Sequence, residues 1–392
     1  MSVMKNASNK KLKVVVAMSG GVDSSVAAAL LKKDGHHITG VFMRCWNADN
    51  FTAGKCTAEE DEMWARRAAA KIGISFYSVD LISEYKGRVV DYFISEYRAG
   101  RTPNPDIMCN SQIKFGVFLD WAINEFGADY IATGHYARLR REIRNSKSEI
   151  RNSKQHSSVG YGAGKSKTLN SKTQTIYKLL RGVDRNKDQS YFLSGLTQEQ
   201  LARAIFPVGK HTKNEVRDMA REFGLPNATR KDSQGLCFIG KVDIRKFLDA
   251  YIPHKKGVVI TTDGRTIGTH NGAHYYTAGQ RHGLGIGGGA PYYVVKKDVK
   301  TNTIVVGNES DAWLNNSDIQ VKNIHWIADA PKLPAKLTAS IRYRQEPQKA
   351  IVKKKSATTL TLAFKEPQYA PAAGQTAVLH KGEEVVGSGI IV

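Results

Sequence analysis

The sequence has few cysteines, no long apolar run and a shortage of acidic residues. Its four cysteines, in 392 residues, stand at positions 45, 56, 109 and 237, with no C-x-x-C pair among them. This spacing fits neither a disulfide scaffold nor a zinc ribbon, and we assign no metal-ligating residues. No apolar run approaches the roughly 20 residues that span a bilayer, and residues 1–13 lack the apolar core of a secretory signal. We therefore expect a cytoplasmic protein that makes no membrane contact.

The shortage of acidic residues leaves a strongly basic chain. Lys and Arg number 58 against 36 Asp and Glu, which gives a formal net charge of +22. Residues 140–172 account for +7 of this, with nine basic and two acidic side chains. The remaining +15 still favours a polyanionic partner such as nucleic acid over a small metabolite.

A glycine-rich turn lies between an apolar run and a helical pattern near the N-terminus. Val14–Met18 reads as a buried strand and Val26–Leu31 as a helix, with Ser19–Ser25 between them. The Gly-Gly pair lets the backbone turn sharply and approach a ligand closely. Free N–H groups and the helix dipole at the start of the helix favour an anion. The turn therefore predicts a phosphate site, although the lysine of the Walker pattern is absent.

Alternating strand and helix patterns continue to about residue 135. Further strands are expected at His37–Met43, Ile74–Val79 and Tyr130–His135, with helical patterns between them. This alternation predicts an α/β fold with a doubly wound parallel sheet. Ligands of such sheets bind beyond the carboxyl ends of the strands, where the glycine-rich turn, Met43 and Thr133–His135 fall.

The second half of the chain has a different pattern. From Gly257 onward, short strands with frequent Gly and Asp turns predict an antiparallel C-terminal β-barrel-like domain. We expect three domains: a catalytic domain over 1–206, a small central domain over 207–307 and the C-terminal β domain over 308–392. Residues 140–173 repeat the hexapeptide Glu-Ile-Arg-Asn-Ser-Lys and are predicted to form a disordered basic insertion.

Two cysteines have surroundings that favour reactivity over packing. Cys109 is expected in a loop over residues 100–110 that two prolines fix, three residues after Asp106. Cys237 is expected in a polar, glycine-containing loop. Basic neighbours lower a thiol pKa, and a carboxylate beside a thiol can accept a proton. Cys45 and Cys56 are interpreted as packing residues.

These residues carry a resemblance to a known family. The turn matches the SGGxDS loop of the PP-loop ATP pyrophosphatases. Further blocks make the chain similar to the bacterial tRNA-specific 2-thiouridylases (MnmA family), and the resemblance covers nearly all of it except Arg140 to Thr173. The matching blocks include AMSGGVDSSV, GRTPNPDIMCN, DYIATGHY, RGVDRNKDQSYFL, KDSQGLCFIG and GQRHGLGIGG.

The resemblance implies two substrate sites. ATP with Mg²⁺ would bind Ala17, Met18, Ser19, Gly20, Gly21, Val22, Asp23 and Ser24, with Met43 and Gly134 beside it. The wobble uridine of a tRNA would be flipped out against Asn104, Pro105 and Asp106. Further tRNA contacts are implied for His135, Lys187, Asp188, Gln189, Arg342, Tyr343 and Gln375. The implied partners are lysine, glutamate and glutamine tRNAs, and a cysteine desulfurase or sulfur-relay protein as donor.

The implied reaction is 2-thiolation. The 2-carbonyl oxygen of the uridine attacks the α-phosphate of ATP, and pyrophosphate leaves. Cys237 carries the sulfur as a persulfide, Cys109 attacks it, and Asp106 is the candidate base. 2-Thiouridine and AMP form, and a Cys109–Cys237 disulfide closes the cycle.

Two alternatives stay open at this point. A PP-loop enzyme with another acceptor, such as a tRNA lysidine synthetase or an amidotransferase-type synthetase, needs no pair of thiols. A non-catalytic RNA-binding protein with ATP as a structural ligand predicts RNA binding without release of pyrophosphate.

Overall fold

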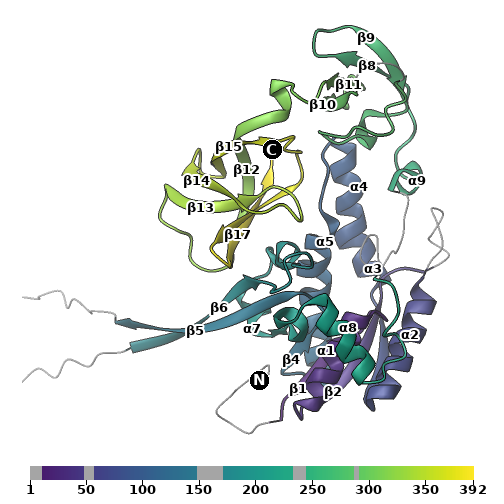
Figure 1. Cartoon of the computed structure of the whole chain (residues 1–392), viewed down its shortest axis with the longest axis vertical. Helices are drawn as coiled ribbons and strands as arrows, with labels where there is room; N and C mark the ends of the chain where they lie inside the picture. The colour runs from purple at the N-terminus through teal and green to yellow at the C-terminus, as the bar shows by residue number, and fades with distance from the viewer. Residues whose placement is uncertain (1–10, 48–56, 148–170, 233–243, 287–290) are drawn as a thin grey trace, which may run out of the picture.

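The computed structural model describes residues 11–47, 57–147, 171–232, 244–286 and 291–392. Figure 1 shows an α/β region at the bottom, a β-sheet region at the top and a barrel to one side. Helix α4 (Asp91–Arg98) extends from the α/β region towards the upper sheet.

The N-terminal region is built on five parallel strands in the order β3-β2-β1-β4-β7. Their bounds are β1 Lys13–Ala17, β2 His37–Arg44, β3 Ser75–Asp80, β4 Tyr130–Ala132 and β7 Ala204–Ile205. The order reverses between β1 and β4, which is where open α/β sheets form a ligand crevice. The predicted α/β fold with a parallel sheet is confirmed.

Helices pack around this sheet and against one another. They are α1 Val22–Lys33, α2 Ala58–Ile72, α3 Ile82–Tyr85, π-helical η2 Lys86–Val90, α4, α5 Pro105–Met108, π-helical η3 Cys109–Val117, α6 Phe118–Phe126, η4 Ser190–Leu193, α7 Gln198–Ala202, η5 Pro207–Lys210 and α8 Lys213–Glu222. Helix α1 packs against α8, where Val26 and Ala27 share one apolar cluster with Val216 and Ala220. This contact brings the start of α8 to the start of α1.

The segment over residues 100–110 is a loop only as far as Asn104, so the predicted loop is wrong for residues 105–110. Pro105 is the first residue of α5, and the Asn104 side chain accepts a hydrogen bond from the N–H of Ile107 at 3.3 Å. Proline suits this position because its φ is already helical and its missing N–H would have no partner there. Helix α5 continues directly into η3 and α6, so Asp106 and Cys109 lie on a helix.

The expected disordered insertion is partly a β-hairpin. Strands β5 (Ala137–Lys147) and β6 (Ser171–Arg181) pair along their whole length, so the expectation is wrong for residues 140–147 and 171–173. Basic side chains that indicated disorder are ion-paired here: Arg140 contacts Glu384 at 3.7 Å, and Arg144 contacts Glu142 at 3.1 Å. Residues 148–170 lie outside the described residues.

The remaining strands form two further sheets. The central one has the order β10-β11-β8-β9, with β8 Gly257–Thr261, β9 Thr266–His270, β10 Tyr293–Asp298 and β11 Thr303–Gly307. The other is antiparallel, and its first and last barrel strands, β12 and β17, also pair, which closes six strands into a barrel. These are β12 Asn315–Trp326, β13 Ala335–Ser340, β14 Gln348–Lys354, β15 Thr359–Tyr369, β16 Thr376–Lys381 and β17 Glu384–Ile391. Short helices α9 Ile244–Asp249, η6 Ala273–Tyr275 and η7 Ala312–Leu314 complete the described chain.

The hairpin joins the barrel to the α/β region. Strand β17 pairs with β6 through Glu384 and Val385, so the barrel sheet continues into β6 and β5. The predicted C-terminal β-barrel is therefore confirmed, and the largest apolar cluster runs from the parallel sheet to Val378 and Val385 of the barrel. None of the helices in the described ranges combines the length and apolar character that crossing a membrane requires.

Candidate active site

The glycine-rich turn lies at the predicted crevice, between the carboxyl ends of β1 and β4. Gly20 has a φ of 76°, which favours glycine, and Gly21 precedes the first residue of α1. The Ser24 hydroxyl accepts from the Ser19 N–H at 3.2 Å and donates to the Gly21 carbonyl at 3.1 Å. The hydroxyl of Ser25 also donates to Gly21 at 3.1 Å. The first N–H groups of α1 have no partner within the helix, and the N-cap residue Gly21 offers them no side-chain acceptor.

Two glycines make the crevice close-fitting. A Cβ on Gly134, in the turn after β4, would lie 2.6 Å from the Ser24 nitrogen and 2.7 Å from the Asp23 carbonyl carbon. A Cβ on Gly20 would lie 2.2 Å from the carbonyl oxygen of Asp61 in α2. Backbone therefore meets backbone on two sides of the turn, so a side chain larger than that of glycine has no room at either position.

Residues after α8 hold the turn from a third side. The Asn227 amide donates to the carbonyl of Gly20 and to the Ser25 hydroxyl, both at 2.9 Å. Arg230 reaches the same Gly20 carbonyl at 3.2 Å and pairs with Asp61 at 2.6 Å. Sequence reasoning missed both residues, because they lie some 200 positions from the turn in a segment without a recognisable motif.

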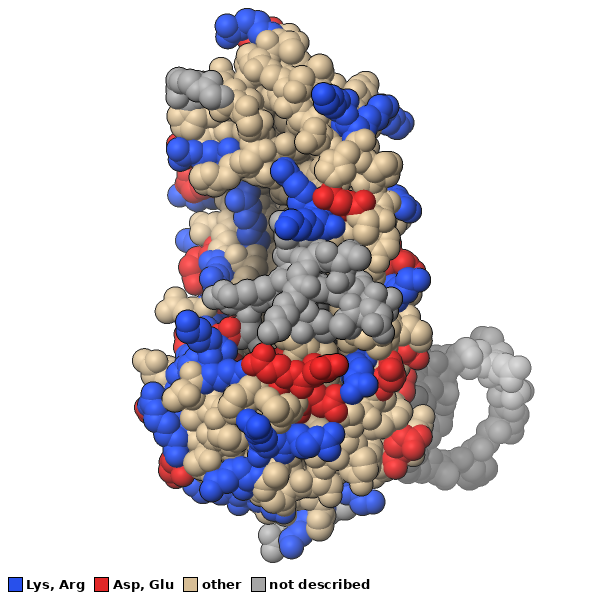
Figure 2. Space-filling view, turned by 90° about the vertical axis from the view of Figure 1, so that its right-hand side faces the viewer, with Lys and Arg blue, Asp and Glu red and all other residues tan. Residues whose placement is uncertain are grey.

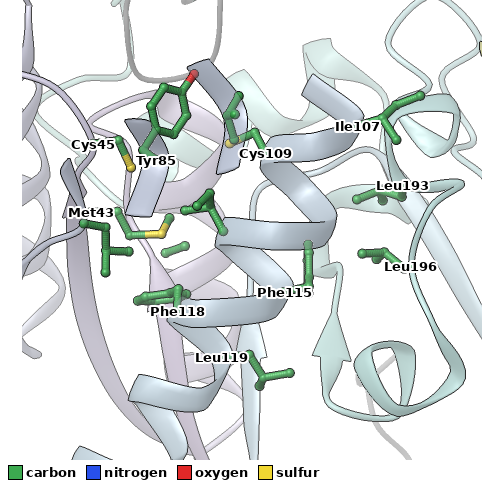
Figure 3. Packing of buried hydrophobic residues seen from close by; sticks show 14 of the residues in the cluster. Met43, Cys45, Tyr85, Ile107, Cys109, Phe115, Phe118, Leu119, Leu193 and Leu196 are labelled. Carbon is green, nitrogen blue, oxygen red and sulfur yellow. The ribbon is translucent and has the colours of Figure 1, made fainter. Parts of the chain in front are cut away.

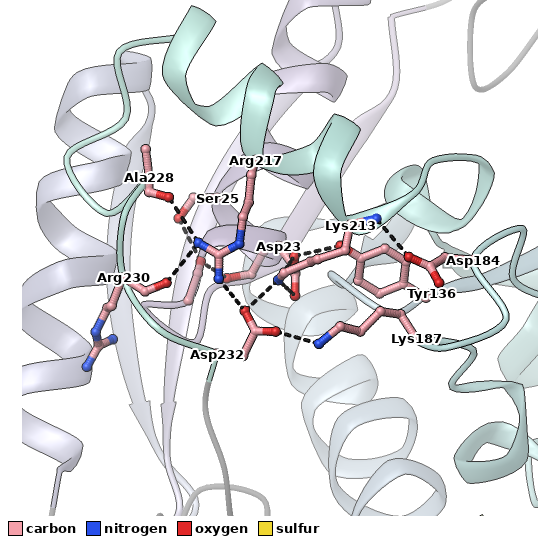
Figure 4. A network of polar contacts seen from close by, with 12 residues as sticks. Asp23, Ser25, Tyr136, Asp184, Lys187, Lys213, Arg217, Ala228, Arg230 and Asp232 are labelled. Atoms are coloured by element: carbon pink, nitrogen blue, oxygen red, sulfur yellow. Dashed lines mark hydrogen bonds and ion pairs between the residues drawn. The ribbon is translucent and has the colours of Figure 1, made fainter. Parts of the chain in front are cut away.

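An ion-pair network surrounds the start of α1 (Figure 4). The Lys213 ammonium lies 2.7 Å from Asp23 and 2.8 Å from Asp232. Asp232 is also paired with Lys187 at 2.6 Å and Arg217 at 2.8 Å. Burial alone would raise the pKa of Asp232, but hydrogen bonds from Lys187 and Lys213 outweigh it and lower that pKa to about 2. This network was also absent from the sequence-based prediction.

The side chains of Ala17, Met18 and Met43 belong to the core beneath the crevice. Their exposed fractions are 7%, 1% and 3% respectively. Among the predicted nucleotide residues, Ser19 is exposed and Asp23 is half-buried, so both can meet solvent. The others offer mainly backbone to a ligand.

Cys109 is buried in the apolar core and not in the accessible loop that the sequence predicted. Its exposed fraction is 0%, and it shares a cluster with Met43, Cys45 and Tyr85 (Figure 3). Helix geometry explains the difference, because η3 faces the parallel sheet. Asp106, in the first turn of α5, remains partly exposed. Cys237 lies outside the described residues, so its predicted loop is not described.

The segment before α5 is held by the barrel. The Gln375 amide donates to the carbonyl of Thr102 at 2.8 Å and to that of Pro103 at 3.3 Å. Asn104 caps α5, and Pro105 is half-buried beside it. Gln375 therefore fixes the chain directly before the Asn104–Asp106 segment.

The turn over residues 187–189 makes internal contacts. Asp188 accepts from the N–H of Gly182 at 2.9 Å and pairs with Arg181 at 2.9 Å. The side-chain amide oxygen of Gln189 accepts from the N–H of Tyr136 at 3.0 Å. Lys187 belongs to the ion-pair network. Lys187 therefore reaches the start of α1, whereas Asp188 lines the cavity that Arg342 and Tyr343 also line.

His135 is buried directly after Gly134. Its Nδ1 lies 2.6 Å from the hydroxyl of Thr133, and its exposed fraction is 8%. Burial, with a smaller contribution from nearby Lys114, holds the pKa of His135 well below its ordinary value. This imidazole is therefore neutral at physiological pH.

Arg342 and Tyr343 follow β13 and face the α/β region. The Arg342 guanidinium donates to the carbonyls of Tyr369 at 2.8 Å and Ala370 at 2.5 Å. The Tyr343 ring lies 4.3 Å from that of Phe192 in η4, centroid to centroid. A cavity of about 30 Å³ lies at this seam, and both Arg342 and Tyr343 line it.

The surface charge agrees with the basic composition. Figure 2 shows Lys and Arg distributed over one face of the molecule, while Asp and Glu gather mainly in its lower half. This face therefore offers many cationic contacts, with acidic groups interspersed among them.

Comparisons with known proteins first define the class of domain. Residues 12–241 match the family model described as "tRNA methyl transferase HUP domain". Residues 245–308 match a "tRNA methyl transferase PRC-barrel domain", and residues 316–391 an "Aminomethyltransferase beta-barrel domain". The parallel sheet with its glycine-rich turn is thus a HUP domain, followed by two β domains.

Full-length relatives then define the family. The chain is 45% identical to the tRNA-specific 2-thiouridylase MnmA of Streptococcus thermophilus, over 98% of this chain and 96% of the relative. It is 44% identical to that of Enterococcus faecalis, with the same shares covered. The chain therefore belongs to the family of tRNA-specific 2-thiouridylases, and the predicted resemblance is confirmed.

Solved structures add little to this assignment. A 4-thiouridine synthetase–RNA complex with bound ATP matches 62% of this chain and 50% of that chain at 19% identity, with a TM-score of 0.32. A score this low carries no argument about function.

Proposed function

We propose that the protein is an ATP-dependent tRNA uridine 2-sulfurtransferase that forms 2-thiouridine at the wobble position. The observation that carries this proposal is the glycine-rich turn Ser19–Ser24 at the switch point of the sheet, in a chain that matches 2-thiouridylases over 98% of its length. The substrates in the names of the relatives supply the proposed acceptor.

ATP fits the glycine-rich turn through backbone groups. The N–H groups at the start of α1 and the close approach of Gly134 leave room for phosphate oxygens without a Cβ in the way. Ala17 to Ser24, Met43 and Gly134 would hold the nucleotide, which supplies the adenylyl group. Among the described residues no cluster of three metal-ligating side chains occurs, and Mg²⁺ would be held chiefly by phosphate oxygens and water.

The sulfur chemistry is assigned to the two cysteines. After adenylation of the 2-carbonyl oxygen, the Cys109 thiolate attacks the Cys237 sulfur of a Cys237 persulfide and releases sulfide. Sulfide adds to the activated carbon, AMP leaves, and the disulfide that remains needs reduction by a thiol. Alternatively the persulfide attacks the carbon directly and Cys109 then resolves it. Asp106 would accept the proton, because its partly exposed carboxylate lies one turn before Cys109.

The burial of Cys109 adds a requirement to this scheme. A thiolate inside an apolar cluster is inert, so the proposed attack needs the α5–η3 segment to shift when RNA binds. The contact of Gln375 with the Thr102 and Pro103 carbonyls links this segment to the barrel, so tRNA bound to the barrel could drive the shift.

The remaining assignments follow the family. We propose Asn104, Pro105 and Asp106 as contacts of the flipped base, and His135, Lys187, Asp188, Gln189, Arg342, Tyr343 and Gln375 as tRNA contacts. Lysine, glutamate and glutamine tRNAs are the proposed substrates, a cysteine desulfurase or relay protein the donor, and the cytoplasm the location. The domain division 1–206, 207–307 and 308–392 is part of the same proposal.

The test combines unmodified tRNA, ATP, Mg²⁺ and a persulfide donor. Wild-type protein should release pyrophosphate and form 2-thiouridine, which nucleoside mass spectrometry separates from a methylated base. Cys237→Ser should release pyrophosphate without thiolation, and Cys56→Ser is the control. Pyrophosphate without a thiolated base would assign another acceptor, and tRNA binding without pyrophosphate release would support the non-catalytic alternative.

A further inference from the structure

An acidic side chain occupies the start of a helix that is proposed to bind an anion. Asp23 is the second residue of α1, so its carboxylate lies within one turn of the first N–H groups of the helix. The same N–H groups attract phosphate. A free carboxylate there would compete for the N–H groups and repel the triphosphate.

Two donors hold this carboxylate to one side. The Tyr136 hydroxyl donates to Oδ1 of Asp23 at 2.8 Å. The Lys213 ammonium contacts Oδ1 at 2.7 Å and Oδ2 at 2.9 Å. Figure 4 shows Asp23, Tyr136 and Lys213 directed towards one another. The exposed fractions of Tyr136 and Lys213 are 2% and 9%, so both donors are withdrawn from solvent.

Lys213 is itself firmly placed. It is the first residue of α8, where Thr212 and Glu215 form a capping box, and its own N–H donates to Asp184 at 2.9 Å. Its third ammonium contact goes to Asp232 at 2.8 Å. An ammonium has three donors, so these carboxylate contacts use all of them.

We propose that Lys213 is a positioning residue of the nucleotide site: it neutralises Asp23 and holds its carboxylate away from the phosphates. This inference rests on the proposed ATP-binding function and deepens it. The Walker lysine, which contacts phosphate from inside the loop, is missing from Ser19–Ser25. Here Lys213, from α8, affects the loop indirectly by pairing with Asp23, the one acidic side chain in Ser19–Ser25.

This role differs from direct phosphate binding in one measurable way. If Lys213 acts only through Asp23, removing the Asp23 charge makes Lys213 dispensable. If Lys213 contacts phosphate itself, its loss stays harmful in either background. A double-mutant cycle therefore separates the two roles.

The experiment measures binding of inorganic pyrophosphate to the full-length protein by calorimetry, without divalent cations. Lys213→Met should weaken binding at least about tenfold, because an unneutralised carboxylate then lies near the anion. Lys213→Met combined with Asp23→Asn should bind within about threefold of wild type. Lys210→Met is the matched control, since Lys210 is exposed and lies three residues earlier.

Thermal unfolding of each variant separates positioning from a loss of fold, because rescue by Asp23→Asn requires an intact site. Unchanged binding by Lys213→Met, or a double variant as weak as the single one, would overturn the inference. If either of these binding results is found and wild type still makes 2-thiouridine, the role of Lys213 is rejected while the proposed function stands. If wild type binds neither pyrophosphate nor ATP, the proposed function itself is rejected.

Discussion

Substituting Gly134 by alanine should damage the nucleotide site by steric overlap alone. The added Cβ would lie 2.6 Å from the Ser24 nitrogen and 2.7 Å from the Asp23 carbonyl carbon. The first separation is about 0.8 Å short of the 3.4 Å at which ordinary contact begins. Both neighbours are backbone atoms in the first turn of α1, so no side chain can rotate away to make room.

The strain has to be relieved by moving the β4 turn away from α1. Overpacking of this kind costs about 1–3 kcal/mol of folding free energy. The same shift displaces the N–H groups at the start of α1, so ATP affinity should fall at least about tenfold, since 1.4 kcal/mol corresponds to tenfold in Kd. Calorimetric titration with a non-hydrolysable ATP analogue measures the affinity, and urea unfolding measures the stability.

Gly87→Ala is the matched control for Gly134→Ala. Gly87 lies in η2 and is exposed, and a Cβ added there would meet no neighbour within 4 Å among the described residues. Alanine there should leave ATP affinity unchanged and raise stability by about 0.5–1 kcal/mol, because glycine loses more backbone entropy in a helix. If Gly134→Ala bound ATP as tightly as wild type does, the inference that Gly134 packs closely against the nucleotide-binding turn would be refuted.

Three further predictions follow from other parts of the structure. Cys109 should react with iodoacetamide at least about tenfold more slowly in the folded protein than in urea, as read by peptide mass spectrometry, because its side chain is fully buried. Gln375→Ala should lower the free energy of unfolding by about 1 kcal/mol, since the Thr102 carbonyl loses its donor. Burial lowers the pKa of His380 to about 4, so protonation of this side chain should remove about 3 kcal/mol of stability as pH falls from 6.5 to 4, and His380→Gln should lose that much less than wild type.

The sign of the His380 effect follows from its folded-state pKa. Because this pKa lies below the unfolded value, the unfolded chain binds the proton first. Stability is therefore complete above pH 6.5 and declines towards pH 4. Equal slopes for wild type and variant in pH-dependent urea unfolding would contradict the burial of His380. For Gln375, an unchanged unfolding midpoint would show that the contact contributes nothing, and rapid alkylation of folded Cys109 would place this thiol at the surface.

The sequence by itself determined the parallel sheet and the position of its crevice. The apolar strand patterns at Val14–Met18 and Tyr130–His135, with helices between them, are local signals: they depend on the spacing of apolar residues and on secondary-structure propensity. The Gly20–Gly21 pair needs only its own backbone freedom to turn. Such features depend on residues that are neighbours in sequence, so they can be predicted from the sequence alone. The same holds for the C-terminal strands that close into the barrel.

Tertiary structure decided which side chains complete the site. Lys213 and Asn227 contact the turn only because α8 packs on α1. Contacts between residues some 200 positions apart produce no repeating pattern in the sequence, so the sequence does not predict them. Cys109 became a core residue because Pro105 begins a helix whose direction turns the thiol towards the sheet. Local sequence determines where the turn and the helices form. The packing of distant elements determines which charged side chains lie beside the turn and whether a thiol is buried.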